Sequence, residues 1–300
     1  MFISSCYGYD AISLDHVVDE CLYCDPSNRK VCIKMITLHA GTYLSPSMPV
    51  EYFEMILQYL ESKLGIHTTL LYESRWEGPR AEREDPFMSG YLDLAWMSST
   101  VYLRMKKESS PIELLPISSI HMHARGFDRP GYYSDVIMHK DLGEKVKEFI
   151  DLRGCKWAYN CPESLSGHVI TLNSLKEIGE NSSFFGNILY SGSHLDSIKM
   201  VIGKKVDAAA VDANCLAFFL ERNSHLADEI KVLTSWGPLP PYPFVVNSKL
   251  DESLKADIMK CLLNMHQDRD GLKKLQEFHF WNNLLLSMQI FILYDSLKQC

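Results

Sequence analysis

Residues 190–213, YSGSHLDSIKMVIGKKVDAAAVDA, predict a strand end, a helix and a second strand in close succession. The strand-like NILYSG leads into the helix HLDSIKMVIGKK, and the small-residue strand VDAAAVDA then carries Asp212 to its C-terminal end. Strands separated by helices imply parallel pairing and an α/β sandwich. The same alternation continues in both directions from this stretch.

The second half of the chain extends the series on both sides. Four upstream segments predict a strand, a helix, a strand and a helix, in the order SDVIMHKD, LGEKVKEFIDLRG, KWAYN and VITLNSLKEIG. The loop CPESLSGH lies between the last two. Downstream, residues 214–222 predict a helix. The run IKVLTSWGPLPPYPFVVNS, with four prolines, predicts an edge strand or a crossing segment.

The first half of the chain holds an earlier β/α series. Residues 33–40 predict a strand, and Pro49 and Gly65 bound an amphipathic helix in PVEYFEMILQYLESKLG. Strands follow in HTTLLYES, LDLAWMSS and IELLPISSI, with a helix near residues 99–107. A closing helical section begins near residue 250 with DESLKADIMKCLLNMHQD.

Two breaks divide these series into lobes. HMHARGFDRPGYY has no clear period, which places one crossing at residues 119–131, and a second crossing is expected near residues 246–250. We therefore expect an α/β fold of two three-layer lobes joined by two crossing segments. The expected parts are a loosely ordered leader (1–32), lobe one (33–119 plus 248–300) and lobe two (120–247).

Composition excludes several classes of protein. The chain has 300 residues with 38 acidic and 30 basic side chains, a formal charge of −8. That balance argues against general nucleic-acid binding, which needs a basic face. No stretch reaches the roughly 20 apolar residues of a membrane helix, and the nearest candidate is residues 284–294. The start has no secretory-signal pattern, and the nine cysteines have no regular framework, so the sequence predicts a cytoplasmic location.

The N-terminal cysteines are a candidate metal site. Cys21 and Cys24 form a CxxC pair, with Cys32 after it and Cys6 and His16 before it. A structural zinc site usually takes four ligands as two paired knuckles, and only one pair is present. We therefore predict no metal and no cofactor, and about one tightly held zinc at these thiols would contradict that prediction.

The segment Ser164-Leu165-Ser166-Gly167-His168 follows a strand and opens a helix. A helix start presents unpaired N–H groups and a partial positive charge, which attract an anion. Ser164 and Ser166 add hydroxyl donors, and Gly167 lets the backbone approach a phosphoryl group closely. The alternative is plain helix capping by either serine.

Two further segments place polar groups at strand ends. His194 begins a helix after Tyr190-Ser191-Gly192-Ser193 and is positioned to donate to an anionic oxygen. The alternative is that Ser193 caps this helix and that His194 is a surface side chain. Asp212 ends the following strand, where its carboxylate can accept hydrogen bonds from a ligand or cap the next helix.

The combined pattern SxSGH…(Y/F)SGSHxxSIxxVxxGKxDAAAVD resembles the phosphate, phosphite and phosphonate substrate-binding proteins of the type-2 periplasmic-binding-protein fold. LDLAWMSSTVY is similar to that family's first-lobe strand, and the proline-rich run near residue 240 is similar to its return strand. The resemblance covers roughly residues 33–265. It implies ligand contacts from both lobes, at Tyr43, Ser98, Ser99, Tyr102, Ser164, Ser166, Gly167, His168, His194 and Asp212.

The function expected from the resemblance is binding of a small oxyanion between the lobes, by an intracellular receptor without turnover. One alternative is an enzyme resembling the thiamine-pyrimidine precursor synthases, for which His168, His194, Cys161 and Cys215 lie near the expected crevice. Another is an interaction protein with a degenerate cleft. Residues 279–300 depart from the family by their apolar character, and we expect this segment to offer a helix for a protein partner.

Overall fold

A computed structural model describes residues 20–24, 30–34, 36–73, 77–80, 82–119, 123, 125, 131–277 and 288–290. The chain divides into two compact units, Met1–Thr37 and Leu38–Cys300. The described part of the first unit is an antiparallel hairpin of β1 (Glu20–Cys24) and β2 (Lys30–Lys34), in which Leu22 pairs with Cys32. Cys6 and His16 lie outside the described residues, so the absence of a metal at the N-terminal thiols stays a prediction.

The second unit contains two five-stranded sheets within its described residues. The first has the order β4 (His67–Tyr72), β3 (Thr37–Thr42), β5 (Leu94–Trp96), β13 (Phe244–Asn247), β6 (Ile112–Leu114). The second has the order β10 (Asn187–Tyr190), β9 (Lys156–Tyr159), β11 (Ala208–Asp212), β8 (Tyr132–His139), β12 (Ile230–Leu239). A short ribbon pairs β7 (Ile117–Ser119) with β14 (Met288–Ile290).

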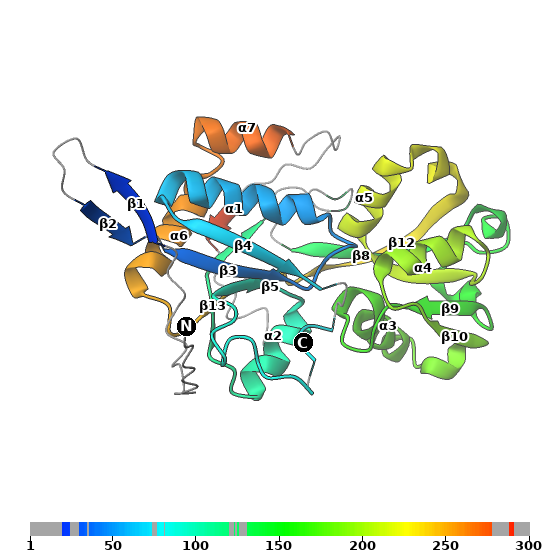
Figure 1. The fold of residues 1–300 in the computed structure, drawn as a ribbon. Helices are drawn as coiled ribbons and strands as arrows, with labels where there is room; N and C mark the ends of the chain where they lie inside the picture. Colours follow the sequence, from blue (N-terminus) through cyan, green and yellow to red (C-terminus); the bar gives the residue numbers. More distant parts are fainter. Residues whose placement is uncertain are drawn as a thin grey trace, which may run out of the picture. The chain divides into compact units, whose positions relative to one another are not determined.

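Helices cover both sheets. They are α1 (Val50–Leu64), α2 (Ser99–Lys107), α3 (Ile170–Glu177), α4 (His194–Ile202), α5 (Ala213–Arg222), α6 (Glu252–Asn264) and α7 (Arg269–Glu277). Figure 1 shows α1 above and α2 below the first sheet. The expected two-lobed α/β fold is confirmed.

Strand direction differs from the expected parallel pairing. β3 pairs with β5 in parallel, and β9 pairs with β10 and β11 in parallel. By contrast, β8 is antiparallel to β11 and β12, and β13 is antiparallel to β5 and β6. β12, at the start of the proline-rich run, is an edge strand, which is one of the two alternatives expected for that run, whereas β13 at the end of the run is an inner strand. The chain passes to the first sheet over residues 240–243, a few residues before the expected crossing at 246–250, and the lobe boundaries stay predictions.

The prediction of a helix at LGEKVKEFIDLRG is wrong. This segment holds only the 3₁₀ turns η1 (Lys140–Leu142) and η2 (Phe149–Leu152). The Asp151 carboxylate accepts hydrogen bonds from the N–H groups of Lys147 and Glu148, at 2.8 and 2.9 Å. Such local side-chain bonds to the backbone compete with the hydrogen bonds of a continuous helix.

Helix α1 illustrates how the sequence sets an element's bounds. Pro49 precedes its first residue, and Gly65 ends it in the left-handed conformation, with φ at 65° and its N–H bonded to the Glu61 carbonyl. Its buried face enters an apolar cluster that Trp96 and Phe244 share with residues of the second lobe, including Leu165 and Phe218. Burial of this cluster therefore stabilises both lobes together.

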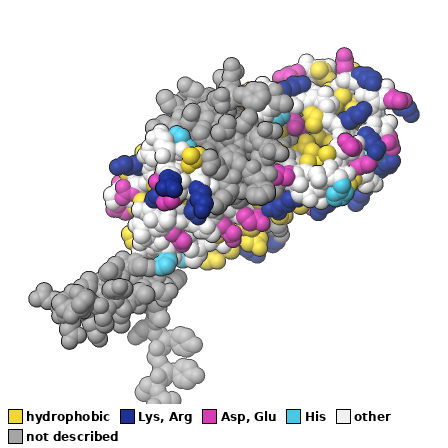
Figure 2. Space-filling view, turned by 90° about the horizontal axis from the view of Figure 1, so that it is seen from above, with side chains coloured by type: hydrophobic (Ala, Val, Ile, Leu, Met, Phe, Trp, Pro, Cys, Tyr) yellow, Lys and Arg dark blue, Asp and Glu magenta, His cyan; other side chains and the backbone are white. Residues whose placement is uncertain are grey.

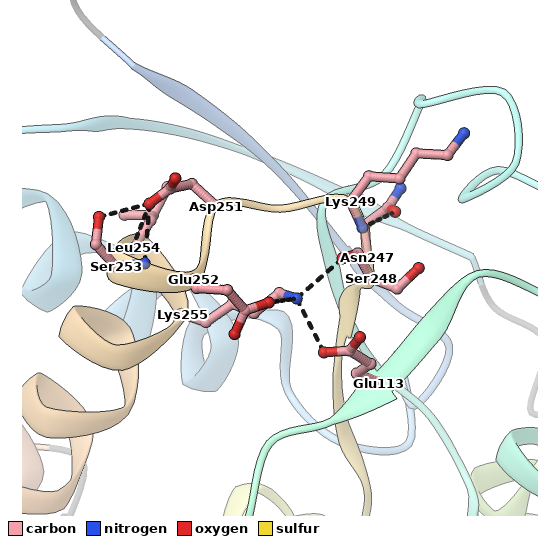
Figure 3. Close-up of polar contacts among 9 residues, drawn as sticks. All are labelled: Glu113, Asn247, Ser248, Lys249, Asp251, Glu252, Ser253, Leu254 and Lys255. Carbon is pink, nitrogen blue, oxygen red and sulfur yellow. Dashed lines mark hydrogen bonds and ion pairs between the residues drawn. The ribbon is translucent and has the colours of Figure 1, made fainter.

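A buried lysine anchors α6 to the first sheet (Figure 3). The Lys255 ammonium donates to Glu113 at 2.9 Å, to Glu252 at 2.7 Å and to the Ser248 carbonyl at 3.0 Å. Burial lowers the pKa of Lys255, but the two carboxylates more than offset this and raise it. Asp251 caps the same helix by accepting from the N–H groups of Ser253 and Leu254.

Replacing Lys255 by methionine is expected to lower the free energy of unfolding by about 1–2 kcal/mol. The change keeps most of the stem but removes three hydrogen bonds, while relieving the cost of burying a charge. Lys255→Ala should cost more, since it also removes the packed stem. Urea unfolding of the three proteins measures this order, and equal stability of Lys255→Ala and the parent would contradict it.

Two observations bear on the expected lack of a nucleic-acid partner and of a membrane span. Figure 2 shows acidic and basic side chains mixed over the described surface of one face. Among the described residues, no helix has both the length and the apolar character needed to cross a membrane.

Candidate functional site

The turn after β9 supplies three of the expected site residues. It leads through residues 160–164 into a π-helical turn, η3 (Leu165–Val169), which continues as α3. The Ser164 hydroxyl accepts a hydrogen bond from the Gly167 N–H at 3.1 Å, so Ser164 does cap this turn. Ser164, Ser166 and Gly167 are all buried. The first N–H groups of a helix have no partner within it, which leaves donors for an anion.

His194 joins this turn from the start of α4, with its side chain fully buried. Its Nε2 atom lies 3.4 Å from Ser164 Oγ and 3.3 Å from Ser166 Oγ. The side-chain nitrogen of Asn160 lies 3.3 Å from the same Nε2. These separations exceed the usual N–H···O distance of about 2.9–3.0 Å. Hydrogen bonds from hydroxyl and imidazole donors to a charged phosphoryl oxygen are shorter than bonds between neutral groups.

The backbone of β11 sets which nitrogen of the ring carries the proton. The Asp212 N–H donates to Nδ1 of His194 at 3.3 Å, so a neutral ring is protonated at Nε2. Complete burial lowers the pKa of His194 to about 3, which keeps the ring neutral near neutral pH. His194 is thus a neutral donor that faces the hydroxyls of Ser164 and Ser166.

Asp212 lies on the other side of the ring and fills one of its two expected roles, the capping of the next helix, while its role toward a ligand stays a prediction. Its carboxylate accepts from the Asn214 N–H at 2.9 Å, which caps α5. The other carboxylate oxygen accepts from the Tyr242 hydroxyl, which in turn receives a hydrogen bond from Asn214 Nδ2 at 3.1 Å. Burial raises the pKa of Asp212 to about 7, against the lowering effect of these hydrogen bonds.

We call seven residues linked by these contacts the His194 cluster: Asn160, Ser164, Ser166, Gly167, His194, Asp212 and Tyr242. They hold one carboxylic acid and no lysine or arginine. An anion at this cluster would therefore be held by hydroxyls, backbone N–H groups and a neutral imidazole rather than by full positive charges.

The start of α2 brings lobe one against this cluster. Ser98 caps α2 by accepting from the Val101 N–H at 3.4 Å, and Ser99 donates to the Pro241 carbonyl at 3.3 Å. The Thr100 hydroxyl donates to the carbonyl of Glu163, the residue before Ser164. The structure therefore brings Ser98 and Ser99 beside the loops that carry Tyr242 and Ser164.

Three expected site residues are held by other contacts. Tyr43 and Tyr102 pack in an apolar cluster of lobe one around Phe87. The ring of His168 lies against that of Tyr159, with centroids 4.7 Å apart, and burial lowers the pKa of His168. Their roles in binding stay predictions.

Sequence reasoning missed two members of the cluster, Asn160 and Tyr242. Asn160 directly follows β9, and the rule that ligands bind at the carboxyl ends of strands would have found it. Its buried Oδ1 has no hydrogen-bond partner among the described residues. Tyr242 lies in the PPYP run, which the sequence marks only as a crossing segment. No local signal in that run points to Asp212.

The opposite pKa shifts of His194 and Asp212 predict a distinctive effect of pH on stability. Between about pH 6.5 and pH 3 the unfolded chain protonates this histidine and the native protein does not, so acid lowers the free energy of unfolding. Asp212 acts in the other direction: its native proton is lost only near pH 7, so its contribution falls as pH rises from about 4 through 7.

Replacing His194 by glutamine should remove the contribution of His194 to the pH dependence of stability and keep that of Asp212. As pH falls from about 6.5 to 5, the free energy of unfolding of the variant should rise relative to that of the parent by up to about 1.4 kcal/mol per pH unit. Urea unfolding at matched ionic strength measures both profiles. Parallel profiles for the two proteins would show that His194 is not kept neutral by burial.

Two α/β lobes, with polar strand ends at their junction, are the architecture of the type-2 periplasmic binding proteins. The family model described as "ABC transporter, phosphonate, periplasmic substrate-binding protein" matches residues 42–282. The chain therefore belongs to the phosphonate substrate-binding family of ABC transporters, as the sequence resemblance predicted.

Solved structures with low sequence identity share the fold. PhnD1 from Prochlorococcus marinus, in complex with methylphosphonate, aligns with a TM-score of 0.67 at 15% identity, over 88% of this chain and 96% of that one. A binding protein of an ABC phosphonate transporter from Pseudomonas aeruginosa aligns with a TM-score of 0.66 at 17% identity, over 85% of this chain and 82% of that one. A Xanthomonas citri protein bound to ATP aligns with a TM-score of 0.63 at 14% identity, over 88% of this chain and 94% of that one.

Family membership corrects the expected location of the protein. The cytoplasmic location, and with it the intracellular receptor, is wrong, because the matched family is periplasmic. That expectation rested on cysteine usage and on the start of the sequence, neither of which bears on the binding lobes. The comparisons support a small ligand but no protein partner at residues 279–300, and that segment lies outside the described residues except for β14.

Proposed function

We propose that this protein binds a small phosphonate or phosphate-type oxyanion at the His194 cluster and presents it to an ABC transporter. The observation that carries the proposal is the convergence of two serine hydroxyls on His194 Nε2, at 3.3–3.4 Å, beside the first turn of a helix. Neutral donors in a buried site discriminate by geometry, since each must meet an oxygen of the anion.

Two observations favour binding without turnover. Burial raises the pKa of Cys161 to about 12 and raises that of Cys215 well above its usual value. Both thiols are therefore protonated near neutral pH and are poor nucleophiles. His194 is also kept neutral, with its Nδ1 occupied by the Asp212 N–H, which suits a fixed donor better than a proton shuttle.

Calorimetric titration of the full chain tests this function. Methylphosphonate, inorganic phosphate and a phosphate monoester serve as ligands, and methanesulfonate serves as a tetrahedral anion of lower charge. Saturable one-to-one binding of at least one phosphorus ligand, in clear preference to methanesulfonate, is expected. Native mass spectrometry of the same preparation shows whether an anion is already bound. Absence of binding by an anion-free preparation would contradict the proposal.

A further inference from the structure

A second group of side chains converges outside the His194 cluster. Glu77, Cys161 and Glu163 each offer one potential ligand atom, and the three atoms lie within 4.8 Å of one another. Glu77 belongs to the segment that follows β4 of the first sheet. Cys161 and Glu163 belong to the loop that follows β9 of the second sheet. The group therefore draws on both lobes.

The carboxylates of this group open onto a cavity of about 260 Å³. Its walls include four glutamates and two arginines, namely Glu77, Glu82, Glu108, Glu163, Arg80 and Arg104. The Arg104 guanidinium is already occupied by the Glu77 and Pro79 carbonyls and the Glu108 carboxylate. Within the described residues, no lysine or arginine forms an ion pair with Glu77 or Glu163. The cavity gives a cation a route to both carboxylates.

The thiol of Cys161 is buried, with only 1% of the residue exposed. The Ser164 N–H donates to the Cys161 carbonyl at 3.2 Å, which fixes the loop that carries the thiol. The Tyr190 hydroxyl donates to the Glu77 carboxylate at 3.2 Å and holds it in place. A partner outside the ligand set that orients a ligating carboxylate is usual in metal sites.

We propose that Glu77, Cys161 and Glu163 form a zinc site that connects the two lobes. Thiolate and carboxylate ligands suit Zn²⁺, whereas Ca²⁺ and Mg²⁺ prefer oxygen ligands alone. With bonds of about 2.0–2.3 Å, tetrahedral zinc holds its ligands roughly 3.5 Å apart. Rotation of the two half-buried carboxylate side chains can shorten the separation of the ligand atoms, which is within 4.8 Å here, to the separation that zinc requires. The fourth position faces the cavity and takes water.

Metal binding would also remove an unfavourable arrangement of charge. Without a metal, the carboxylates of Glu77 and Glu163 lie beside the buried thiol of Cys161, and among the described residues no ion pair with a lysine or arginine offsets them. When Zn²⁺ binds, a zinc–sulfur bond replaces the sulfur–hydrogen bond and the proton passes to solvent. One dication then neutralises two carboxylates and one thiolate to a net charge of −1. The site is independent of the proposed anion-binding function.

Titration of the full, metal-free chain with Co²⁺ and Zn²⁺ tests the site. Co²⁺ bound to a thiolate gives a charge-transfer band in the near ultraviolet, and competition by Zn²⁺ gives the zinc affinity. We expect Cys161→Ser to abolish the band of this site. Glu163→Gln, a milder change at a half-exposed side chain, should keep the band and weaken affinity at least about tenfold.

Matched variants separate this site from the other thiols and acids of the chain. Cys155→Ser removes another thiol of the second lobe, and Glu82→Gln and Glu108→Gln remove acids of the same cavity. Cys21→Ser/Cys24→Ser removes the N-terminal pair. All four should leave the band and the affinity unchanged. A band that survives Cys161→Ser and disappears in the N-terminal variant would overturn the proposal, as would unchanged affinity in Glu163→Gln.

Discussion

Replacing Gly167 by valine is expected to weaken methylphosphonate binding more than about 100-fold and to lower the free energy of unfolding by about 1–3 kcal/mol. A Cβ atom at this position would lie 1.8 Å from Oδ1 of Asn160 and 3.1 Å from Cε1 of His194. Asn160 is fully buried and contacts the same histidine, so it cannot yield without displacing the ring. The substitution therefore damages the donor array itself.

Calorimetry with methylphosphonate and urea unfolding together measure this result. Gly167→Ala should give an intermediate loss, since its single methyl group meets the same two side chains. Gly203→Ala is a matched control at the opposite end of α4, where φ is −75° and a Cβ would approach the Lys199 carbonyl at 3.2 Å. Affinity within tenfold of the parent for Gly167→Val would rule out the close packing described for this turn.

Replacing His194 by alanine is expected to weaken phosphonate binding about ten- to a hundredfold, or roughly 1.5–3 kcal/mol for one hydrogen bond to a charged oxygen. The change removes the Nε2–H that faces Ser164 and Ser166, and it leaves the Asp212 N–H without its acceptor. The second loss also destabilises the fold, because an unpaired buried donor is costly.

Affinity and stability can be separated by a second variant. His194→Gln keeps a side-chain amide that can donate from this position, so it should fold and recover part of the binding. His225→Ala changes an exposed histidine and should leave affinity unchanged. Phosphate and methylphosphonate are titrated at matched pH and salt. Parent-like affinity for both anions in a folded His194→Ala protein would remove His194 from the site.

The sequence predicted those parts of the fold and site that depend on neighbours along the chain. Residues 187–212 form β10, α4 and β11 as expected, because apolar periodicity and small residues are local signals. The capping of η3 by Ser164 and of α5 by Asp212 was also readable from residue type and position.

The features that the sequence did not predict depend on contacts between distant segments. The carboxylate of Asp212 meets the hydroxyl of Tyr242 thirty residues later, across the crossing between β12 and β13. Strand order has the same origin, since the alternation of strands and helices leaves open that β8 lies antiparallel beside β11. The stretch around Gly143 and Glu148 has helical spacing, but the turns at Asp151 compete successfully with a helix.

The return of the chain to the first sheet through β13 has a consequence for the order of folding during synthesis. All five strands of the second sheet lie within residues 132–239, so that lobe can complete its pairing as one continuous segment. The first sheet cannot do so, because its inner strand β13 lies between β5 and β6 and leaves the ribosome last among them. Until residue 247 has emerged, β5 and β6 each lack a neighbour and expose unpaired backbone, the condition in which nascent strands associate with other chains. Nascent chains stalled before β13 should therefore depend on a chaperone, and chains stalled beyond it should resist protease in both lobes.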